Sequence, residues 1–198
     1  QDPANGNLHS SINLVERATG LYSNQPNMSV PCSHPTGCGN AEIIGTGSIN
    51  IGSFAYQSSG VRAEGIGVIG NTGKINVTGD NNYGAVVTGG YFSNHIWTPS
   101  NYIGEINITA NNAIGIYVNG NSATGENKAS LIVNGNNSIG IQVNNGLAYN
   151  LGINNDPLDY WRGDGTIETT GINSHAVVLT RDNSAINTVF QNGGIIKN

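Results

Sequence analysis

Ile106-Asn-Ile-Thr-Ala-Asn-Asn-Ala-Ile-Gly-Ile-Tyr-Val118 is one of three stretches of this chain that are nearly identical. The other two run from Ile75 to Val87 and from Leu131 to Val143, and a weaker fourth copy runs from Ile167 to Leu179. Such repeats are typical of stacked structural units, none of which buries its apolar face alone. The repetition therefore predicts a solenoid.

The positions within each copy indicate β-structure. Apolar or β-branched residues alternate with polar ones at both ends of a copy, which is typical of short, half-buried strands. Between these strands lies a polar turn with Asn at the same place in all four copies: Asn81, Asn112, Asn137 and Asn173. Asn tolerates the left-handed conformation of a sharp corner, and its amide can bond the same Asn one coil away. We predict an all-β chain.

The repeat length sets the kind of solenoid. Successive units begin at residues 12, 49, 75, 106, 131, 167 and 196, which are 25 to 37 residues apart. That is the size of one coil of a right-handed parallel β-helix, in which each strand pairs with its equivalent one coil on. We expect one domain over residues 1–198 with six to seven coils. Residues 65–70 and 185–190 are candidates for a third strand, whereas residues 119–128 are almost wholly polar.

Charge and composition exclude several classes of partner. The net charge is −5, and only seven residues are Lys or Arg. Nucleic acids and anionic membranes need clustered basic residues, so we expect neither as a partner. No run of eighteen apolar residues occurs, and residues 1–20 lack the profile of a signal peptide. If the protein is secreted, its signal has been removed.

Cys32 and Cys38 are the only cysteines, and two prolines and a glycine lie between or beside them. This spacing favours a local disulfide and hence an oxidising compartment. A zinc site with both thiolates and His34 is the alternative, although it needs a fourth ligand from elsewhere. We expect no metal and no cofactor.

The motif from Gly73 to Val87, repeated with Asn-rich corners, resembles the passenger domain of Gram-negative autotransporters, particularly the pertactin-like adhesins. The resemblance covers about residues 10–198. It implies a β-helix that is exported through the periplasm and the outer membrane to the cell surface, where a separate C-terminal barrel anchors it. We expect this chain to be an N-terminal fragment of such a passenger. Closely spaced cysteines are also what the resemblance implies.

Three long coils contain insertions, at residues 24–41, 88–103 and 144–164. We place the extra residues after the second strand each time, so that all three emerge from one edge of the solenoid, roughly 10 Å apart. They contain most of the large aromatic residues, namely Tyr91, Phe92, His95, Trp97, Tyr102, Tyr149, Tyr160 and Trp161. Aromatic residues on exposed loops are typical of protein-binding hot spots. Packing of these rings against the flank of the helix is the alternative.

The third insertion ends in Arg162-Gly163-Asp164, which is similar to the integrin-recognition tripeptide. On a tight turn the guanidinium and the carboxylate point apart, and the Asp can complete a metal site in a receptor. The alternative is a polar turn in which Arg162 pairs with Asp159 or Asp164. The tripeptide makes an integrin a candidate partner.

Enzymatic readings have little support in the sequence. Glycan-active β-helix enzymes need several carboxylates on one sheet face, and Asp156, Asp159 and Asp164 form the only acidic cluster. We therefore expect a non-enzymatic protein, secreted or at the bacterial surface, that binds a host receptor or matrix protein through its loops. A glycan-active lyase or hydrolase and a structural, self-associating stalk are the alternatives.

Overall fold

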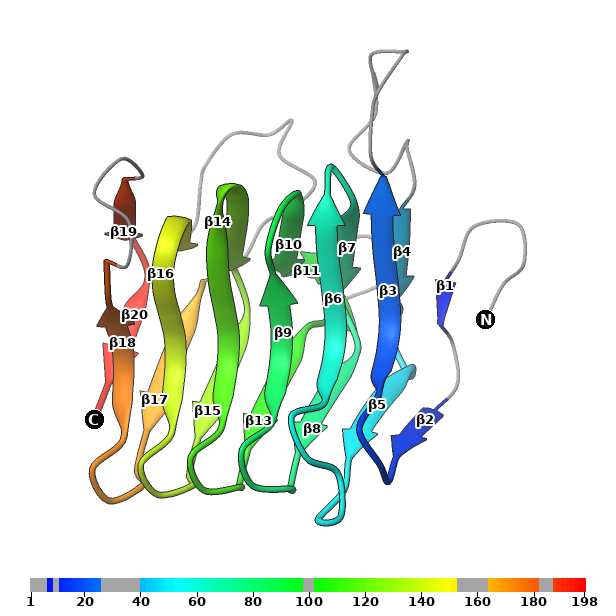
Figure 1. The fold of residues 1–198 in the computed structure, drawn as a ribbon. Coiled ribbons are helices and arrows are strands. Elements are labelled where there is room, and N and C mark those ends of the chain that lie inside the picture. The colour runs from blue at the N-terminus through cyan, green and yellow to red at the C-terminus, as the bar shows by residue number, and fades with distance from the viewer. Residues whose placement is uncertain (1–6, 9–10, 26–39, 98–101, 153–163, 182–186) are drawn as a thin grey trace.

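A computed structural model describes residues 7–8, 11–25, 40–97, 102–152, 164–181 and 187–198 of the chain. These residues form a parallel β-helix with three strand positions in each coil (Figure 1). In Figure 1 the chain rises along the front strands, descends behind them and advances from right to left, which makes the helix right-handed. The predicted fold class is confirmed.

Three stacks of parallel strands build the coils. The first stack contains β2 (Ser11–Leu14), β5 (Ser48–Ile51), β8 (Lys74–Val77), β13 (Glu105–Ile108), β15 (Ser130–Val133), β17 (Thr166–Thr169) and β20 (Ile195–Lys197). The second contains β3 (Thr19–Gln25), β6 (Ser59–Gly65), β9 (Tyr83–Val87), the beginnings of β14 (Ile114–Asn127) and β16 (Ile139–Asn150), and β18 (His175–Leu179). The third contains β1 (Asn7–Leu8), β4 (Asn40–Ile43), β7 (Val68–Asn71), β10 (Tyr91–Asn94), the ends of β14 and β16, and β19 (Thr188–Asn192).

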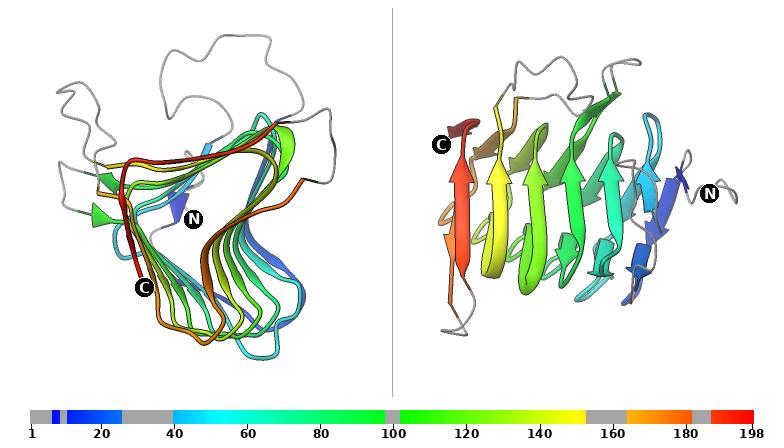
Figure 2. Two further views of the ribbon diagram at one scale, coloured as in Figure 1. Left: turned by 90° about the vertical axis from the view of Figure 1, so that its left-hand side faces the viewer. Right: turned by 90° about the horizontal axis from the view of Figure 1, so that it is seen from above.

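Three corners join the stacks in each coil (Figure 2). We call the junction from the first to the second stack the first corner, that from the second to the third stack the second corner, and that from the third stack to the next coil the third corner. Because β14 and β16 continue through the second corner, the second and third stacks form one 11-stranded sheet. The first stack is a separate seven-stranded sheet.

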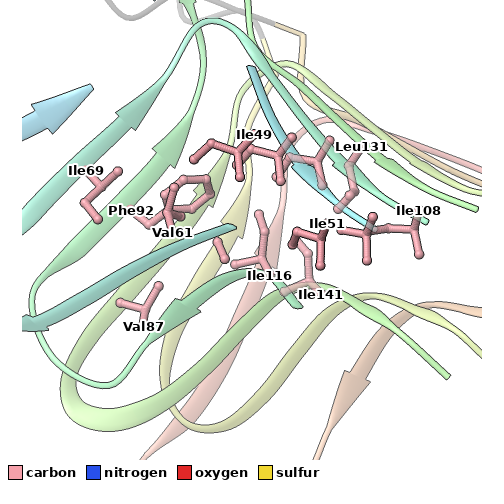
Figure 3. Packing of buried hydrophobic residues seen from close by; sticks show 14 of the residues in the cluster. Ile49, Ile51, Val61, Ile69, Val87, Phe92, Ile108, Ile116, Leu131 and Ile141 are labelled. Carbon is pink, nitrogen blue, oxygen red and sulfur yellow. The ribbon is translucent and has the colours of Figure 1, made fainter. Parts of the chain in front are cut away.

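The register of the first stack confirms the predicted repeat starts. The first residue of every unit pairs with the first residue of the next, in the column Ile12, Ile49, Ile75, Ile106, Leu131, Ile167 and Ile196. The members from Ile49 to Ile167 are wholly buried. Figure 3 shows Ile49 and Leu131 among the buried side chains inside the coils, with Val61 and Phe92. Each apolar residue therefore packs on its own equivalents one coil away.

The recurring Gly of each copy marks a close approach between coils. Gly84, Gly115 and Gly140 lie where the second stack begins, with no unusual backbone angle. A Cβ on Gly115 would lie 2.6 Å from the Gly140 carbonyl oxygen and 2.6 Å from Leu131 Cδ1. A side chain at this position would therefore separate the second stack from the first.

The corner asparagines behave as predicted in their backbone. Asn81, Asn112, Asn137 and Asn173 have φ values of 59°, 52°, 52° and 55°. Their side chains are exposed, however, and the amide ladder between coils forms at other residues. It runs inside the third stack through Asn71, Asn94, Asn127, Asn150 and Asn192, and each amide Nδ2 donates to the next Oδ1 at 2.8 Å.

The ladder is buried and makes a second set of bonds. Asn71, Asn94, Asn127 and Asn150 have no exposed surface. Nδ2 of Asn94 also donates to the Ser130 carbonyl at 3.0 Å, and that of Asn127 donates to the Thr166 carbonyl at 3.1 Å. Asn94 lies in β10, which leads into β13, but it bonds β15, and Asn127 of β14, which leads into β15, bonds β17. The ladder thereby ties each third-stack strand to the first-stack strand one coil beyond the strand that it leads into, across the third corner.

The insertions leave the coils at other places than the sequence analysis predicted, because each coil has a third strand. The strand β7 lies within or next to residues 65–70 as predicted, and β14 extends through the polar residues 119–127. Because β10 and the end of β16 belong to the third stack, the extra residues of the second and third insertions leave at the third corner, after His95 and after Asn150. Those of the first insertion leave at the second corner, between β3 and β4. The insertions thus emerge at two edges, not one.

The close approach at Gly115 predicts that adding a single methyl group there lowers the stability of the fold. We expect Gly115→Ala to lower the free energy of unfolding by about 2 kcal/mol or more, because the added Cβ overpacks the junction of two stacks. Gly193→Ala is the matched control, since a Cβ there would meet only the Gly152 nitrogen, at 3.6 Å. Urea unfolding followed by circular dichroism measures both. Equal stabilities of the two variants would contradict the packing argument.

The ladder predicts that loss of a buried ladder amide lowers stability more than loss of an amide on the outward face of a strand. Asn127→Ala leaves a buried N–H of Asn94 and the buried Oδ1 of Asn150 without these partners, at about 1–3 kcal/mol for each group. Asn107→Ala removes a half-buried outward amide that donates to Asn76 at 3.2 Å, and we expect it to cost about 1 kcal/mol or less. Thermal unfolding of both variants checks that Asn127→Ala is the less stable of the two. An Asn107→Ala variant that is less stable than Asn127→Ala would contradict the prediction.

Candidate functional site

The structure describes some of the predicted site residues. Tyr160, Trp161, Arg162, Gly163, Cys32 and Cys38 lie outside the described residues, as do Asp156 and Asp159. Asp164 is exposed and lies two residues before β17, at the third corner. Trp97 ends β11 (Ile96–Trp97), which is also at this corner. The tripeptide as a whole therefore stays a prediction.

Three aromatic residues assigned to exposed loops are instead part of the third stack. Tyr91 and Phe92 lie in β10, and Tyr149 lies in β16. Phe92 points inward, is wholly buried and packs in the apolar core, so the prediction that it contacts a partner was wrong (Figure 3). His95 follows β10 directly and is also wholly buried. The reason is that residues 91–94 form the regular third strand of their coil.

The part of the second insertion that leaves the coil forms a small antiparallel hairpin. In it β11 pairs with β12 (Tyr102–Ile103), and the Gly104 nitrogen donates to the His95 carbonyl at 2.8 Å. The Tyr102 ring packs on Gly45, where a Cβ would lie 2.8 Å from ring carbons. Gly45 also has a φ of +53° at the third corner of an earlier coil. The hairpin is therefore held against the flank of the solenoid.

The same hairpin still presents apolar surface to solvent. The exposed fraction is 39% for Tyr102 and 55% for Ile103. Tyr102 thus packs on the flank with one part of its ring and remains exposed with another. The third corner therefore has an apolar patch on a braced backbone.

Charged side chains on the outward face of the third stack are largely buried. Glu126 Oε2 accepts from the Tyr91 hydroxyl and from Ser93 Oγ at 3.4 Å, and it pairs with Lys128 Nζ at 3.4 Å. The side chains of Lys128 and Glu126 are only 14% and 12% exposed. This ion pair lies at the end of β14, directly before the third corner. It fixes the side chains around that corner.

A second polar contact bridges two coils of the third stack. His95 Nε2 lies 3.7 Å from Glu42 Oε1, and its Nδ1 lies 3.2 Å from the Ser93 carbonyl oxygen. Gly70 lies between Glu42 and Ser93 in the register, and a Cβ there would lie 3.0 Å from the His95 ring. The missing side chain of Gly70 therefore leaves room for the His95 ring to reach Glu42.

These carboxylates do not have the spacing of a glycosidase pair. The register places Glu42 and Glu126 three strands apart, roughly 14 Å along the stack. The two carboxyl groups of glycoside hydrolases lie about 5 to 9.5 Å apart. Within the described residues no group of three or more His, Cys, Asp and Glu side chains is arranged to hold a metal ion.

The sequence analysis missed a carboxylate on the outward face of the second stack. Glu64 accepts from the Tyr22 hydroxyl at 2.8 Å and from Arg62 Nε at 2.5 Å. These two bonds, the Tyr22 bond first, lower the pKa of Glu64 below its usual value. The signal in the sequence is the two-residue spacing of Arg62 and Glu64 in one strand. Its pairing with Tyr22 required the coil register.

The sequence analysis also missed an apolar first corner. Residues 52–58 span seven positions between β5 and β6, whereas residues 78–82 span five between β8 and β9. In Figure 1 this longer corner projects below the others. The exposed fraction is 88% for Phe54, 56% for Tyr56 and 61% for the nearby Val15. Two aromatic residues in a corner that is otherwise Gly, Ser, Ala and Gln were the available signal.

Comparison with known proteins gives no relative of the chain. No family model, no curated protein and no solved structure matches it significantly. A search of the described residues for a helix long and apolar enough to span a bilayer finds none.

The lowered pKa of Glu64 predicts a pH-dependent contribution to stability. Because its folded pKa lies below the reference value of 4.5, the ionised side chain stabilises the fold at pH values above about 4.5, and this contribution is lost as the pH falls through the folded pKa. We expect wild type to be more stable than Glu64→Gln at pH 7, and the difference to shrink as the pH falls below 4.5. Denaturant unfolding across this range checks it. A difference that is constant with pH would contradict the assignment.

Proposed function

We propose that this chain is a non-enzymatic binding protein, secreted or displayed on a bacterial surface, whose β-helix holds a docking site for a host receptor or matrix protein at the third corner. The observation that carries the proposal is the exposed apolar pair Tyr102 and Ile103 on a hairpin braced against Gly45. Exposed aromatic and aliphatic side chains on a rigid support lose little conformational entropy on binding. They are therefore suited to anchor a protein partner.

A second segment at the same corner extends the proposed site. Asp164 lies at the third corner that precedes β17, two coils beyond the corner that carries the hairpin. The two segments are therefore roughly 10 Å apart along the solenoid. One folded partner domain can contact both, since a typical interface buries about 800 Å² on each partner. Under this proposal Asp164 is the acidic end of Arg162-Gly163-Asp164, and an integrin is a candidate receptor.

The resemblance to autotransporter passengers supports the same proposal. A passenger of the adhesin type is exported to the cell surface as a β-helix, which would present the third corner to host cells. Against a glycan-active enzyme stands the spacing of Glu42 and Glu126, which is too long for a pair of catalytic carboxylates. Against a plain stalk stands the apolar surface of the braced hairpin, for which a stalk has no use.

The proposal predicts that attachment depends on the third corner. We expect the purified chain to bind epithelial or endothelial cells, as measured by flow cytometry. We also expect the Tyr102→Ser, Ile103→Ser double variant to bind at least tenfold less, because the apolar anchors are gone. The Phe54→Ser, Tyr56→Ser double variant is the matched control, since it removes two large apolar side chains that are at least as exposed, from the first corner. Circular dichroism verifies that both variants keep their β-structure.

Several outcomes would overturn the proposal. Binding that survives the third-corner variant, or that is lost only with the first-corner variant, would place the docking site elsewhere. Cleavage of a glycan substrate that disappears with Asp164→Asn would make the protein an enzyme. Asp164→Glu tests the integrin separately, because it keeps the charge but lengthens the side chain. Unchanged attachment of Asp164→Glu would exclude an integrin and leave the hairpin as the docking site.

A further inference from the structure

A different surface of the chain carries a connected network of uncharged polar side chains. It lies on the outward face of the second stack, over three consecutive coils. Tyr117 of β14 pairs with Gln142 of β16, and Gln142 pairs with Val178 of β18. Asn119 and Asn144 lie beside this row, two residues further along β14 and β16. We call Tyr117, Asn119, Gln142 and Asn144 the amide–tyrosine face.

Hydrogen bonds connect all four side chains of this face. The Tyr117 hydroxyl oxygen accepts from Asn144 Nδ2 at 2.9 Å and from Asn119 Nδ2 at 3.1 Å. Gln142 Nε2 donates to Asn144 Oδ1 at 3.0 Å, and the Thr180 hydroxyl donates to the same oxygen. These bonds fix the positions of the amide groups before any ligand arrives, which lowers the entropy cost of binding.

The face retains hydrogen-bonding capacity toward solvent. A primary amide has two N–H donors and a carbonyl oxygen with two lone pairs, and the network uses one donor of Gln142. All four side chains are half-buried, so part of each remains accessible. Gln142 lies in the middle of the three coils. It is therefore the residue best placed to offer both a donor and an acceptor to a ligand.

An aromatic surface adjoins the amides. The Tyr83 ring in the preceding coil contacts the Tyr117 ring, with ring centroids 5.6 Å apart and planes tilted by 50°. Both rings are half-buried on the outward side of the second stack. The network and the rings together thus combine apolar ring faces with planar amide groups.

The second-stack parts of the strands that carry this face, and of the two strands beside them, contain no charged residue apart from the titratable His175. This holds for residues 83–87, 114–119, 139–145 and 175–179. Elsewhere the outward positions carry charges, as at Arg62 and Glu64 in β6 and at Lys74 and Glu105 in the first stack. An anionic or cationic ligand would gain no ion pair from the four members of the amide–tyrosine face, and the nearest charge along β18 is Arg181, which follows Thr180 at the edge of the face. The absence of charge therefore favours an uncharged, strongly hydrogen-bonding ligand.

We propose that the amide–tyrosine face binds a neutral oligosaccharide that runs parallel to the coil axis. A sugar ring has C–H groups on its faces, which pack on aromatic rings, and pairs of hydroxyl groups at its edge, which bond bidentately to amides. Neighbouring coils are roughly 4.8 Å apart, a spacing close to the width of one sugar ring. Successive sugars therefore meet Tyr117 and then Gln142 in consecutive coils. This site is separate from the docking site at the third corner.

The test uses a printed panel of uncharged hexose and N-acetylhexosamine oligosaccharides beside sulfated and uronate-containing ones, with the purified full chain as probe. We expect saturable binding to at least one uncharged oligosaccharide and a loss of at least tenfold with Gln142→Ala. Asn76→Ala is the matched control, because Asn76 is a half-buried outward amide that bonds its neighbours in the first stack at 2.7 Å and 3.2 Å. We expect its binding to equal that of wild type.

The remaining outcomes decide against the proposal. It fails if no uncharged member of the panel binds, if only anionic members bind, or if Gln142→Ala and Asn76→Ala bind alike. Should Gln142→Ala lose its β-structure by circular dichroism, Gln142→Glu replaces it, since this variant keeps the size of the side chain and removes both amide donors. Cell attachment that depends on Tyr102 does not bear on this result, so the two proposals fail separately.

Discussion

In-register stacking of parallel strands is the constraint on which the rest of this structure depends. Each inward side chain meets its own equivalents in the coils before and after it, so a column must consist of residues that pack well on copies of themselves. Isoleucine meets this requirement in the first stack, where the column from Ile49 to Ile167 contains only Ile and one Leu, Leu131. Asparagine meets it in the third stack, because one amide holds both a donor and an acceptor and can bond the next amide in a continuous ladder.

The same constraint determines where the chain can vary. A change inside a column affects the coils on both sides, since each residue contacts two equivalents. A change in a corner affects mainly its own coil. Coil length therefore ranges from 25 to 37 residues while the register of the columns is kept. The extra residues leave at the second and third corners, and the described hairpin at the third corner is folded back onto Gly45.

The sequence was sufficient to predict the fold, the seven unit starts and the left-handed corner asparagines, because these features recur in every copy. It was insufficient for the third strand. The inward residues that pack in the core there are Ile69, Phe92, Gly125 and Ala148, which differ so much in size that they form no repeating apolar pattern. Phe92 was therefore assigned to an insertion, and the ladder asparagine of each coil could not be distinguished from the many Asn residues of the corners. Tyr22, Glu64 and the members of the amide–tyrosine face come together only through the register between coils.

Outward side chains do not have to pack on their own equivalents in neighbouring coils. Their composition therefore differs among the three stacks. The third stack buries its outward charges in contacts such as Lys128 with Glu126, which brace the third corner. The second stack keeps uncharged amides and tyrosines half-exposed over three coils. A braced corner with apolar side chains suits a protein surface, because anchors that are already fixed lose little entropy on binding. An uncharged face suits an uncharged ligand, because amide and tyrosine side chains offer donors and acceptors without leaving a charge unpaired. One regular scaffold can thus support two kinds of recognition without altering a single inward column.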